Sequence, residues 1–222
     1  MRAMVLAAGR GERLRPLTDR LPKPLVRVRG AALIEHHLRA LADAGFKDVV
    51  INTAWLAERI EAALGDGAAY GVRIHYSRET PGALDTGGGI RNALPLLGQA
   101  PFAAINADIL TDYDFTRLRT PLPADADARL VLVPNPPHNP AGDFGLDDDG
   151  RVTSESAYTF AGIGVYRPAL LAAEPRTRFG LAAVLRPAVA AGRVIGEIHR
   201  GVWHDVGTPE ALERLGGGRC DG

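Results

Sequence analysis

The chain has 222 residues, 46% of them hydrophobic, which is enough for one α/β domain with a sizeable core. Its 26 basic and 26 acidic residues balance to a formal net charge of zero, so we expect no binding to nucleic acid or to a membrane surface, and any phosphate site must be local. The only cysteine, Cys220, excludes an intramolecular disulfide framework and a zinc site made of cysteines.

The chain opens on a short apolar run, Arg2–Ala7, which predicts a strand rather than a signal peptide, and we expect a cytoplasmic protein. Further apolar runs predict strands at Asp48–Asn52, Val72–Tyr76, Phe102–Asn106, Leu130–Val133, Phe160–Tyr166 and Val194–His199. Helices are predicted at Ala32–Ala44, Trp55–Leu64, Ile90–Leu97 and Leu181–Ala191, and Thr208-Pro209 opens a last short helix. This alternation indicates a Rossmann-like, mostly parallel mixed sheet flanked by helices, with ligands at the carboxyl ends of its strands.

The segment Asp143–Thr153 departs from this alternation. It resembles a hairpin that turns at Asp149-Gly150, so we expect a small antiparallel insertion that could form one wall of a cleft. The pair His36-His37 lies inside a predicted helix without a third metal ligand. We expect one of these histidines to face solvent and the other to pack.

A glycine loop, Gly9-Arg10-Gly11-Glu12-Arg13, directly follows the first strand. Such a loop lets backbone N–H groups approach a phosphate chain, and the arginines can add charge-assisted hydrogen bonds. An ordinary tight turn is the alternative. The loop is neither a Walker A motif, which needs a following Gly-Lys-Ser/Thr, nor the Gly-x-Gly-x-x-Gly dinucleotide fingerprint.

Lysine is rare in this chain, because Lys23 and Lys47 are the only two among the 26 basic residues. An ammonium group is a compact point charge, whereas guanidinium is a planar fork, so a site that needs the first cannot freely change to arginine. Lys23 is therefore a candidate phosphate ligand, with chance as the alternative.

The whole string from Leu6 to Thr18, followed by Pro22-Lys23-Pro24-Leu25, resembles the sugar-1-phosphate nucleotidyltransferases, whose signature is L-x-x-G-x-G-x-R-L-x-P-L-T with P-K-P-L shortly after. The resemblance covers nearly the entire chain and implies the nucleotide-diphospho-sugar transferase fold. In that family the loop surrounds the nucleotide, the arginine binds the triphosphate and the lysine bridges the reacting phosphates. It thus implies catalytic roles for Arg13 and Lys23 and nucleotide contacts from Ala7, Ala8, Gly9, Gly11, Glu12 and Arg13.

Two aspartates each follow a predicted strand. Asp108 ends Asn106-Ala107-Asp108, and Asp205 lies in Trp203-His204-Asp205-Val206-Gly207-Thr208. Each alone could be a turn residue. The resemblance places metal-binding aspartates in an N-x-D turn and a W-x-D-x-G-T turn, and so implies that both are catalytic and bind one Mg²⁺ ion, with Asp108 also contacting the nucleotide.

The glycine run Asp85-Thr86-Gly87-Gly88-Gly89 precedes the helix predicted at Ile90–Leu97. Glycines at a helix start leave backbone groups uncovered, and these could hydrogen-bond a flat base edge; a flexible N-cap is the alternative. In the related enzymes the corresponding segment reads the base, which assigns Thr86, Gly87 and Gly88 to the nucleotide. We interpret Glu79, just upstream, as a surface charge, with a contact to the sugar or ribose as the alternative.

On the sugar side, the resemblance implies substrate contacts from Asn106, Asn135, Gly145, Glu155, Gly162 and Asp205. Many hexose enzymes of the family carry E-K-P with the lysine on the sugar phosphate, whereas this chain has Glu155-Ser156-Ala157. Together with Ile51–Leu56 and Asp85–Ile90, this departure is most similar to members that transfer UMP from UTP to N-acetylmuramate 1-phosphate, a step of cell-wall sugar recycling. Mannose- or glucose-1-phosphate enzymes using GTP, UTP or dTTP are the alternative.

We expect one domain over residues 1–222, with a nucleotide-binding half at roughly 1–110, a sugar-binding half at 111–215 and a flexible tail at 216–222. We expect a monomer or a small homo-oligomer. A non-catalytic nucleotide-sensing subunit would be expected to lose Arg13, Lys23, Asp108 or Asp205, and all four are present. A dinucleotide-dependent oxidoreductase needs a third loop glycine and an acidic residue near Asn52, and both are missing.

Overall fold

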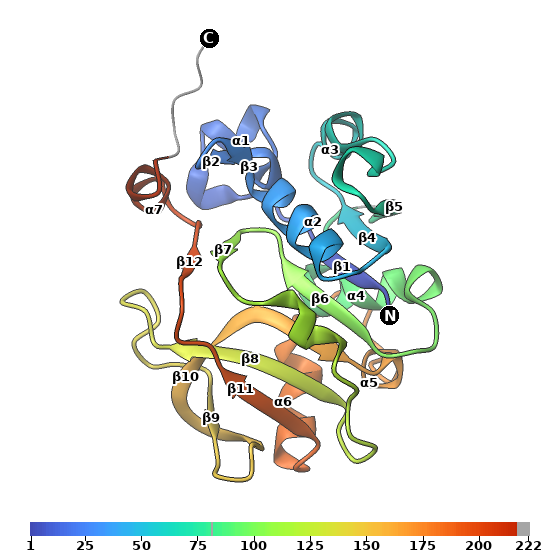
Figure 1. The fold of residues 1–222 in the computed structure, drawn as a ribbon, viewed down its shortest axis with the longest axis vertical. Coiled ribbons are helices and arrows are strands. Elements are labelled where there is room, and N and C mark those ends of the chain that lie inside the picture. The colour runs from blue at the N-terminus through green and yellow to red at the C-terminus, as the bar shows by residue number, and fades with distance from the viewer. Residues whose placement is uncertain (81, 217–222) are drawn as a thin grey trace.

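The computed structural model of the chain describes residues 1–80 and 82–216. Its centre is an eight-stranded sheet with the order β11-β8-β10-β6-β1-β4-β5, and β9 pairs with β10 (Figure 1). The strands are β1 (Ala3–Leu6), β4 (Asp48–Thr53), β5 (Arg73–Arg78), β6 (Phe102–Asn106), β8 (Ala128–Pro134), β9 (Phe144–Leu146), β10 (Val152–Tyr166) and β11 (Val194–Ile198).

The strand directions bring several carboxyl ends to one edge of the sheet. Strand β1 runs parallel to β4 on one side and to β6 on the other, and β5 is parallel to β4. Strand β11 is parallel to β8, whereas β10 is antiparallel to both β6 and β8. The predicted mixed, mostly parallel sheet is therefore confirmed, and the ends of β1, β4, β5 and β6 lie next to one another, where such sheets bind ligands.

Helices cover both faces of the sheet (Figure 1). The helices are α1 (Leu17–Arg20), α2 (Leu33–Asp43), α3 (Ala57–Leu64), α4 (Asp85–Leu97), α5 (Pro168–Ala172), α6 (Ala182–Ala190) and α7 (Pro209–Arg214), with short 3-10 turns η1 (Glu12–Leu14), η2 (Lys23–Leu25), η3 (Ala68–Tyr70) and η4 (Phe115–Arg119). On β1, Ala3 and Val5 belong to the core beneath α2 and α3, whereas Met4 belongs to the core beneath α4 and α6. Burial of both faces explains why the strands are continuous apolar runs.

A third, smaller core joins the two ends of the described chain. The hairpin of β2 (Arg27–Val28) and β3 (Ala31–Ala32) packs against β7 (Ile109–Thr111) and α7 through Val28, Leu110 and Leu212. Strand β12 (Trp203–Asp205) pairs antiparallel with β7, with Asp205 opposite Ile109. In Figure 1 this red C-terminal segment lies beside the blue N-terminal elements. The pairing carries Asp205 next to the turn that follows β6.

Three local expectations have clear outcomes. The hairpin is confirmed, because β9 pairs with the start of β10 and Gly150 turns with a φ of 76°. The strand expected at Phe160–Tyr166 begins much earlier, at Val152. The helix expected to open at Ile90 begins at Asp85, so that prediction is wrong, and its glycines lie inside the first turns. Residues 217–222 of the expected flexible tail, which include Cys220, lie outside the described residues.

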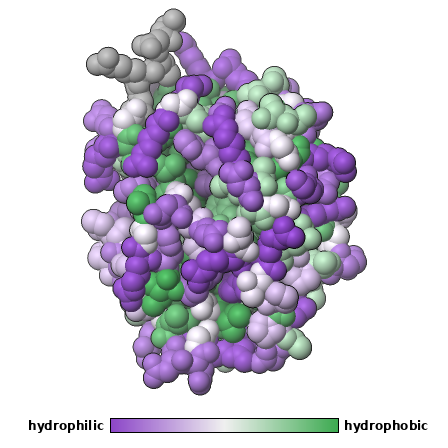
Figure 2. Space-filling view, in the orientation of Figure 1, coloured by the Kyte–Doolittle hydropathy of each residue, from purple (hydrophilic) through white to green (hydrophobic). Residues whose placement is uncertain are grey.

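The described surface carries few exposed apolar side chains. Figure 2 shows one face as a mosaic of hydrophilic and hydrophobic residues. Among residues 1–80 and 82–216, Met1 and Val202 are the only exposed large hydrophobic residues. Across these same two ranges, none of the helices has the length and apolar character needed to cross a bilayer.

Candidate active site

The glycine loop begins where β1 ends. Gly11 has a φ of 69°, which favours glycine, and a Cβ atom there would lie 3.0 Å from Thr18 Cγ2 and 3.1 Å from Lys23 Cβ. The Thr18 hydroxyl donates to the Gly11 carbonyl over 2.8 Å and fixes the turn. Gly9 is different, because a Cβ atom there would meet nothing within 4 Å. Packing therefore requires glycine at position 11, whereas position 9 leaves open space that a ligand could enter.

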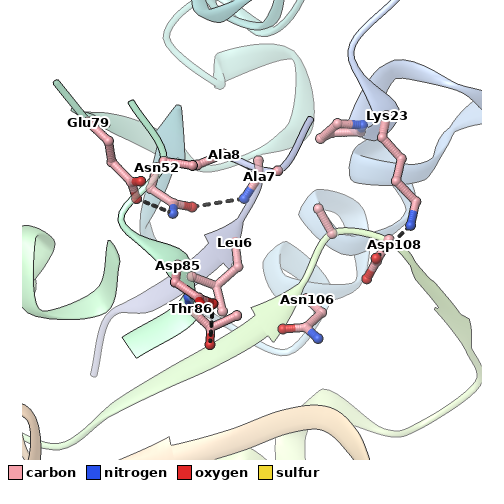
Figure 3. A pocket seen from close by; sticks show the side chains of 14 residues that line it. Leu6, Ala7, Ala8, Lys23, Asn52, Glu79, Asp85, Thr86, Asn106 and Asp108 are labelled. Carbon is pink, nitrogen blue, oxygen red and sulfur yellow. Dashed lines mark hydrogen bonds and ion pairs between the residues drawn. The ribbon is translucent and has the colours of Figure 1, made fainter. Parts of the chain in front are cut away.

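Lys23 and Asp108 form an ion pair beside the glycine loop. Lys23 opens η2, is only 8% exposed, and its Nζ lies 2.6 Å from Asp108 Oδ2. Asp108 lies in the turn between β6 and β7. Both residues line the loop pocket, a cavity of about 200 Å³ that is also lined by Leu6, Ala7, Ala8, Gly9, Pro24, Asn52, Glu79, Ala83, Asp85, Thr86, Asn106 and Ala107 (Figure 3).

A second pair, Arg13 and Asp205, lies close to the first. Arg13 Nη2 is 3.6 Å from Asp205 Oδ2, and His138 Nε2 is 3.7 Å from the same oxygen. The backbone joins the two pairs, because Val206 N donates to the Asp108 carbonyl over 2.8 Å. Arg13, Asp108, His138 and Asp205 line the carboxylate pocket, a cavity of about 300 Å³. The structure thus brings the four expected catalytic residues together.

Asp205 also has an unusual oxygen. Its Oδ1 atom is buried and has no hydrogen-bond partner among the described residues. A buried carboxylate oxygen without a partner is costly, and a cation would relieve the cost. Carboxylate oxygens are the ligands that Mg²⁺ prefers, and one or two suffice beside phosphate oxygens. Asp108 and Asp205 therefore fit a magnesium site.

A third cavity, the aromatic pocket of about 260 Å³, lies beside the loop pocket. Its walls include Phe144 from the antiparallel insertion, Phe160 from β10, and Leu181, Leu185 and Arg186 at α6. Arg186 is exposed and makes no hydrogen bond or ion pair with the residues that the structure describes. It is thus a free cation at the wall of a cavity whose lining also includes the acidic residue Asp143.

Asn106 connects all three cavities, since it lines the loop, carboxylate and aromatic pockets. Gly162 on β10 makes room for it, because a Cβ atom at position 162 would lie 2.7 Å from Asn106 Nδ2. The register of β10 against β8 shifts between Phe160 and Gly164, around this glycine. The three pockets therefore share a wall at the end of β6.

Some of the other residues expected to contact the nucleotide or the sugar line one of these pockets, and others do not. Ala7, Ala8, Gly9 and Thr86 line the loop pocket, and Thr86 also lines the aromatic pocket. Gly11, Glu12, Asn135, Gly145 and Glu155 line none of the three pockets. Asn135 accepts a hydrogen bond from the Thr159 hydroxyl over 2.9 Å, and Gly145 lies in the hairpin against Thr153.

Gly87 and Gly88 are buried in α4 rather than open at its start. A Cβ atom on Gly87 would lie 2.4 Å from the Phe179 ring, and Gly88 N donates to the Phe179 carbonyl over 3.0 Å. The expectation of uncovered backbone groups is therefore wrong for Gly88, whose N–H group is already bonded. These glycines let α4 pack closely on the segment before α6.

Glu79 is not a surface charge, so that interpretation was wrong. It is 4% exposed and accepts hydrogen bonds from Asn52 Nδ2 and Leu84 N, both over 2.6 Å. Burial raises the pKa of the Glu79 carboxyl above its ordinary value. Asn52, His138 and Arg186 are site residues that sequence reasoning missed, and Glu79 was considered only as an alternative contact to the sugar or ribose. The available signal was a polar side chain at or just after the end of an apolar strand, as in Asn52 and Glu79.

Comparison with known proteins agrees with this geometry. A model of the nucleotidyl transferase family matches residues 2–216. An N-acetylmuramate alpha-1-phosphate uridylyltransferase of Neisseria meningitidis serogroup B is 53% identical over 216 residues, which cover 94% of both chains. A protein of the same name from Caulobacter vibrioides is 37% identical over 224 residues, covering 94% of this chain and 93% of that one.

A solved structure extends the likeness to the fold. A Bacillus anthracis protein that carries the provisional name glucose-1-phosphate thymidylyltransferase superposes with a TM-score of 0.83 and covers 97% of this chain and 94% of its own. The two sequences share 19% identity, so this likeness concerns the fold alone.

Proposed function

The chain belongs to the nucleotidyl transferase family, and we propose on this premise that it transfers UMP from UTP to N-acetylmuramate 1-phosphate, forming UDP-N-acetylmuramate and pyrophosphate. The observation that carries the proposal is the meeting of two cation–carboxylate pairs, Lys23 with Asp108 and Arg13 with Asp205, beside the glycine loop. The 53% identity to the Neisseria uridylyltransferase over 94% of both chains supports the substrates.

The nucleotide would occupy the loop pocket. The N–H groups of Ala8 and Gly9 make no backbone hydrogen bond within the described ranges, so they are available to phosphate oxygens. Lys23 at the loop pocket and Arg13 at the carboxylate pocket supply the positive charge that a triphosphate needs. Thr86, at the border with the aromatic pocket, is proposed to face the nucleoside.

The sugar phosphate would occupy the aromatic pocket. Phe144, Phe160 and Leu185 offer apolar surface to the acetyl and methyl groups of the sugar. Arg186 is proposed to hold the sugar phosphate, because the family lysine is replaced by Ser156 and this arginine is the free cation at the pocket. A cation on α6 would thus replace the family lysine that this chain lacks at position 156.

Magnesium would be held by Asp108 and Asp205, for which the orphaned Oδ1 atom of Asp205 is the supporting observation. When bound, the ion would supply neutralisation of the phosphate charge. The protein itself contributes alignment. Asn106 lies where the three pockets meet, so it is placed to orient the sugar phosphate against the nucleotide.

The reaction needs little further chemistry from side chains. An oxygen of the ionised sugar phosphate attacks the α-phosphorus of UTP in line, the bond to the β-phosphate oxygen breaks, and pyrophosphate leaves. The nucleophile is already deprotonated, so no general base is required. Lys23 and Arg13 would stabilise the charge that develops on the phosphates.

Pyrophosphate release from a matrix of triphosphates (UTP, GTP, dTTP) and sugar 1-phosphates tests the proposal. We expect the fastest release from UTP with N-acetylmuramate 1-phosphate, and none without a divalent cation. Faster release from GTP with mannose 1-phosphate would move the chain to the guanylyltransferase alternative. Tight UTP binding without release from any pair would indicate the nucleotide-sensing alternative.

A further inference from the structure

Two buried polar side chains of the loop pocket form a hydrogen-bonded relay to the backbone of the glycine loop. Asn52, at the end of β4, is 3% exposed, and Glu79, just after β5, is 4% exposed. Glu79 Oε1 accepts from Asn52 Nδ2 over 2.6 Å, and Asn52 Oδ1 accepts from Ala7 N over 2.8 Å. Figure 3 shows Asn52 between Glu79 and Ala7, with both bonds drawn. The relay joins the ends of three neighbouring strands.

The carboxylate decides which way the Asn52 amide faces. An ionised carboxylate only accepts hydrogen bonds, whereas an amide has one donating and one accepting end. Glu79 therefore selects the Nδ2 end of Asn52 and leaves Oδ1 for Ala7. The other Glu79 oxygen accepts from Leu84 N over 2.6 Å, which ties the relay to the start of α4.

The hydrogen bond to Ala7 lies where β1 leaves the sheet. Leu6 is the last residue of β1 and lies opposite Asn52 and Asn106 in the two parallel pairings. The next N–H group, that of Ala7, bonds to a side chain instead of a strand carbonyl. The Asn52 side chain thus sets the point from which Ala8 and Gly9 turn toward the loop pocket.

Gly89 provides the space that the relay needs. A Cβ atom at this position would lie 2.4 Å from Glu79 Oε1 and 2.7 Å from Asn52 Nδ2. Such distances are too short for real contacts, so any side chain at position 89 would push the two groups apart. The third glycine of the run therefore has a role distinct from Gly87 and Gly88, which pack against the segment at Phe179.

We propose that Glu79 and Asn52 are positioning residues that hold the glycine loop in the form that binds the UTP phosphates. The inference rests on the proposed function for the identity of the nucleotide. Neither residue needs to touch a reacting atom, because their effect reaches the nucleotide through the backbone of Ala7.

Exchanging the amide at position 52 with the carboxylate at position 79 tests the relay. In Glu79→Gln, the glutamine amide cannot accept from both Leu84 N and Asn52 Nδ2, so one donor faces another donor. In Asn52→Asp, two carboxylates face each other unless they share a proton, so this variant is measured above about pH 8, where sharing is disfavoured. The double variant Asn52→Asp/Glu79→Gln restores every bond: the introduced glutamine accepts from Leu84 N and donates to the introduced aspartate, which also accepts from Ala7 N.

The readouts are hydrogen exchange of the Ala7 amide in the free protein, KM for UTP, kcat and thermal stability. Each single variant should expose the Ala7 amide to faster exchange and raise KM for UTP about tenfold or more, with a smaller change in kcat. The double variant should recover both properties. Asn92→Asp is the matched control, since Asn92 lies on α4 and bonds Ser77 outside the relay; it should change neither.

Two results would overturn the relay: single variants that leave Ala7 exchange and KM unchanged, or a double variant no better than the singles. If a single variant fails to fold, Gly89→Ala takes its place and should show the same rise in KM, although alanine is the better helix former. The exchange measurement needs no substrate. A wild-type protein inactive on N-acetylmuramate 1-phosphate would therefore reject the proposed function and leave the relay standing.

Discussion

Lys23 Nζ lies 2.6 Å from Asp108 Oδ2, although 85 positions separate the two residues. The lysine stem packs against the backbone of Gly11, so the ammonium group is fixed between the glycine loop and the end of β6. A positive charge is thereby held beside the carboxylate proposed to bind metal.

The charge of Lys23 should matter for catalysis more than for folding. Lys23→Met keeps the apolar stem and removes the charge, and we expect turnover to fall about 10²-fold or more while thermal stability changes little. Lys23→Arg should recover little activity, because a planar fork does not reproduce a point charge. Steady-state kinetics and thermal unfolding of both variants check this, and full activity of Lys23→Arg would contradict it.

The proposed shared metal site predicts linked effects at Asp108 and Asp205. Asp108→Asn and Asp205→Asn should each weaken Mn²⁺ binding to the UTP complex, measured by electron paramagnetic resonance, because each removes a charged oxygen ligand. Activity should fall with Mg²⁺ and recover in part at high Mg²⁺ or with Mn²⁺. UTP binding without metal should change little. Unchanged Mn²⁺ affinity in both variants would rule out the shared site.

Arg186 should act on the sugar phosphate alone. Arg186→Ala removes a charge-assisted contact, so KM for the sugar phosphate should rise about tenfold or more while KM for UTP stays near its original value. Arg200→Ala is a suitable control, because Arg200 is also exposed and lines none of the three pockets. An equal rise in both KM values would place Arg186 on the nucleotide instead.

His37 predicts an acid sensitivity of folding. Burial lowers the pKa of this histidine from 6.5 to about 4, so the stability linked to it is present above pH 6.5 and is lost as the pH falls toward 4. This shift corresponds to about 3 kcal/mol of unfolding free energy between pH 7 and pH 4. Urea unfolding of His37→Leu should lack this component, whereas His36→Leu should retain it. Parallel pH profiles for the wild type and His37→Leu would contradict the assignment.

The sequence was most informative where burial and local pattern agree. Strand β6 coincides with the predicted run Phe102–Asn106, because every strand residue except Asn106 is buried and apolar. The first half of β10 was missed, since Ser154, Glu155 and Ser156 are exposed and carry no apolar signal. The start of α4 was misplaced because glycine is a poor helix former, and the packing against Phe179 overrides that preference.

The residues of the site also divide into those that a local sequence pattern predicts and those that only the fold brings together. Lys23, Asp108 and Asp205 stand in recognisable motifs at strand ends and could be predicted. Glu79 could not be assigned, because its burial depends on Asn52 and Leu84 as partners, which no local pattern specifies. Arg186 was missed for a related reason: an arginine on a short helix becomes a candidate ligand only once the fold places it beside Phe144 and Phe160.

The most direct test of the account is a competition experiment. The protein is given limiting UTP with equal concentrations of N-acetylmuramate 1-phosphate, glucose 1-phosphate and mannose 1-phosphate, and the nucleotide sugars are quantified by mass spectrometry. The product ratios then equal the ratios of kcat/KM. The account predicts that UDP-N-acetylmuramate exceeds each other product by about tenfold or more, and a mixture dominated by UDP-glucose or UDP-mannose would contradict it.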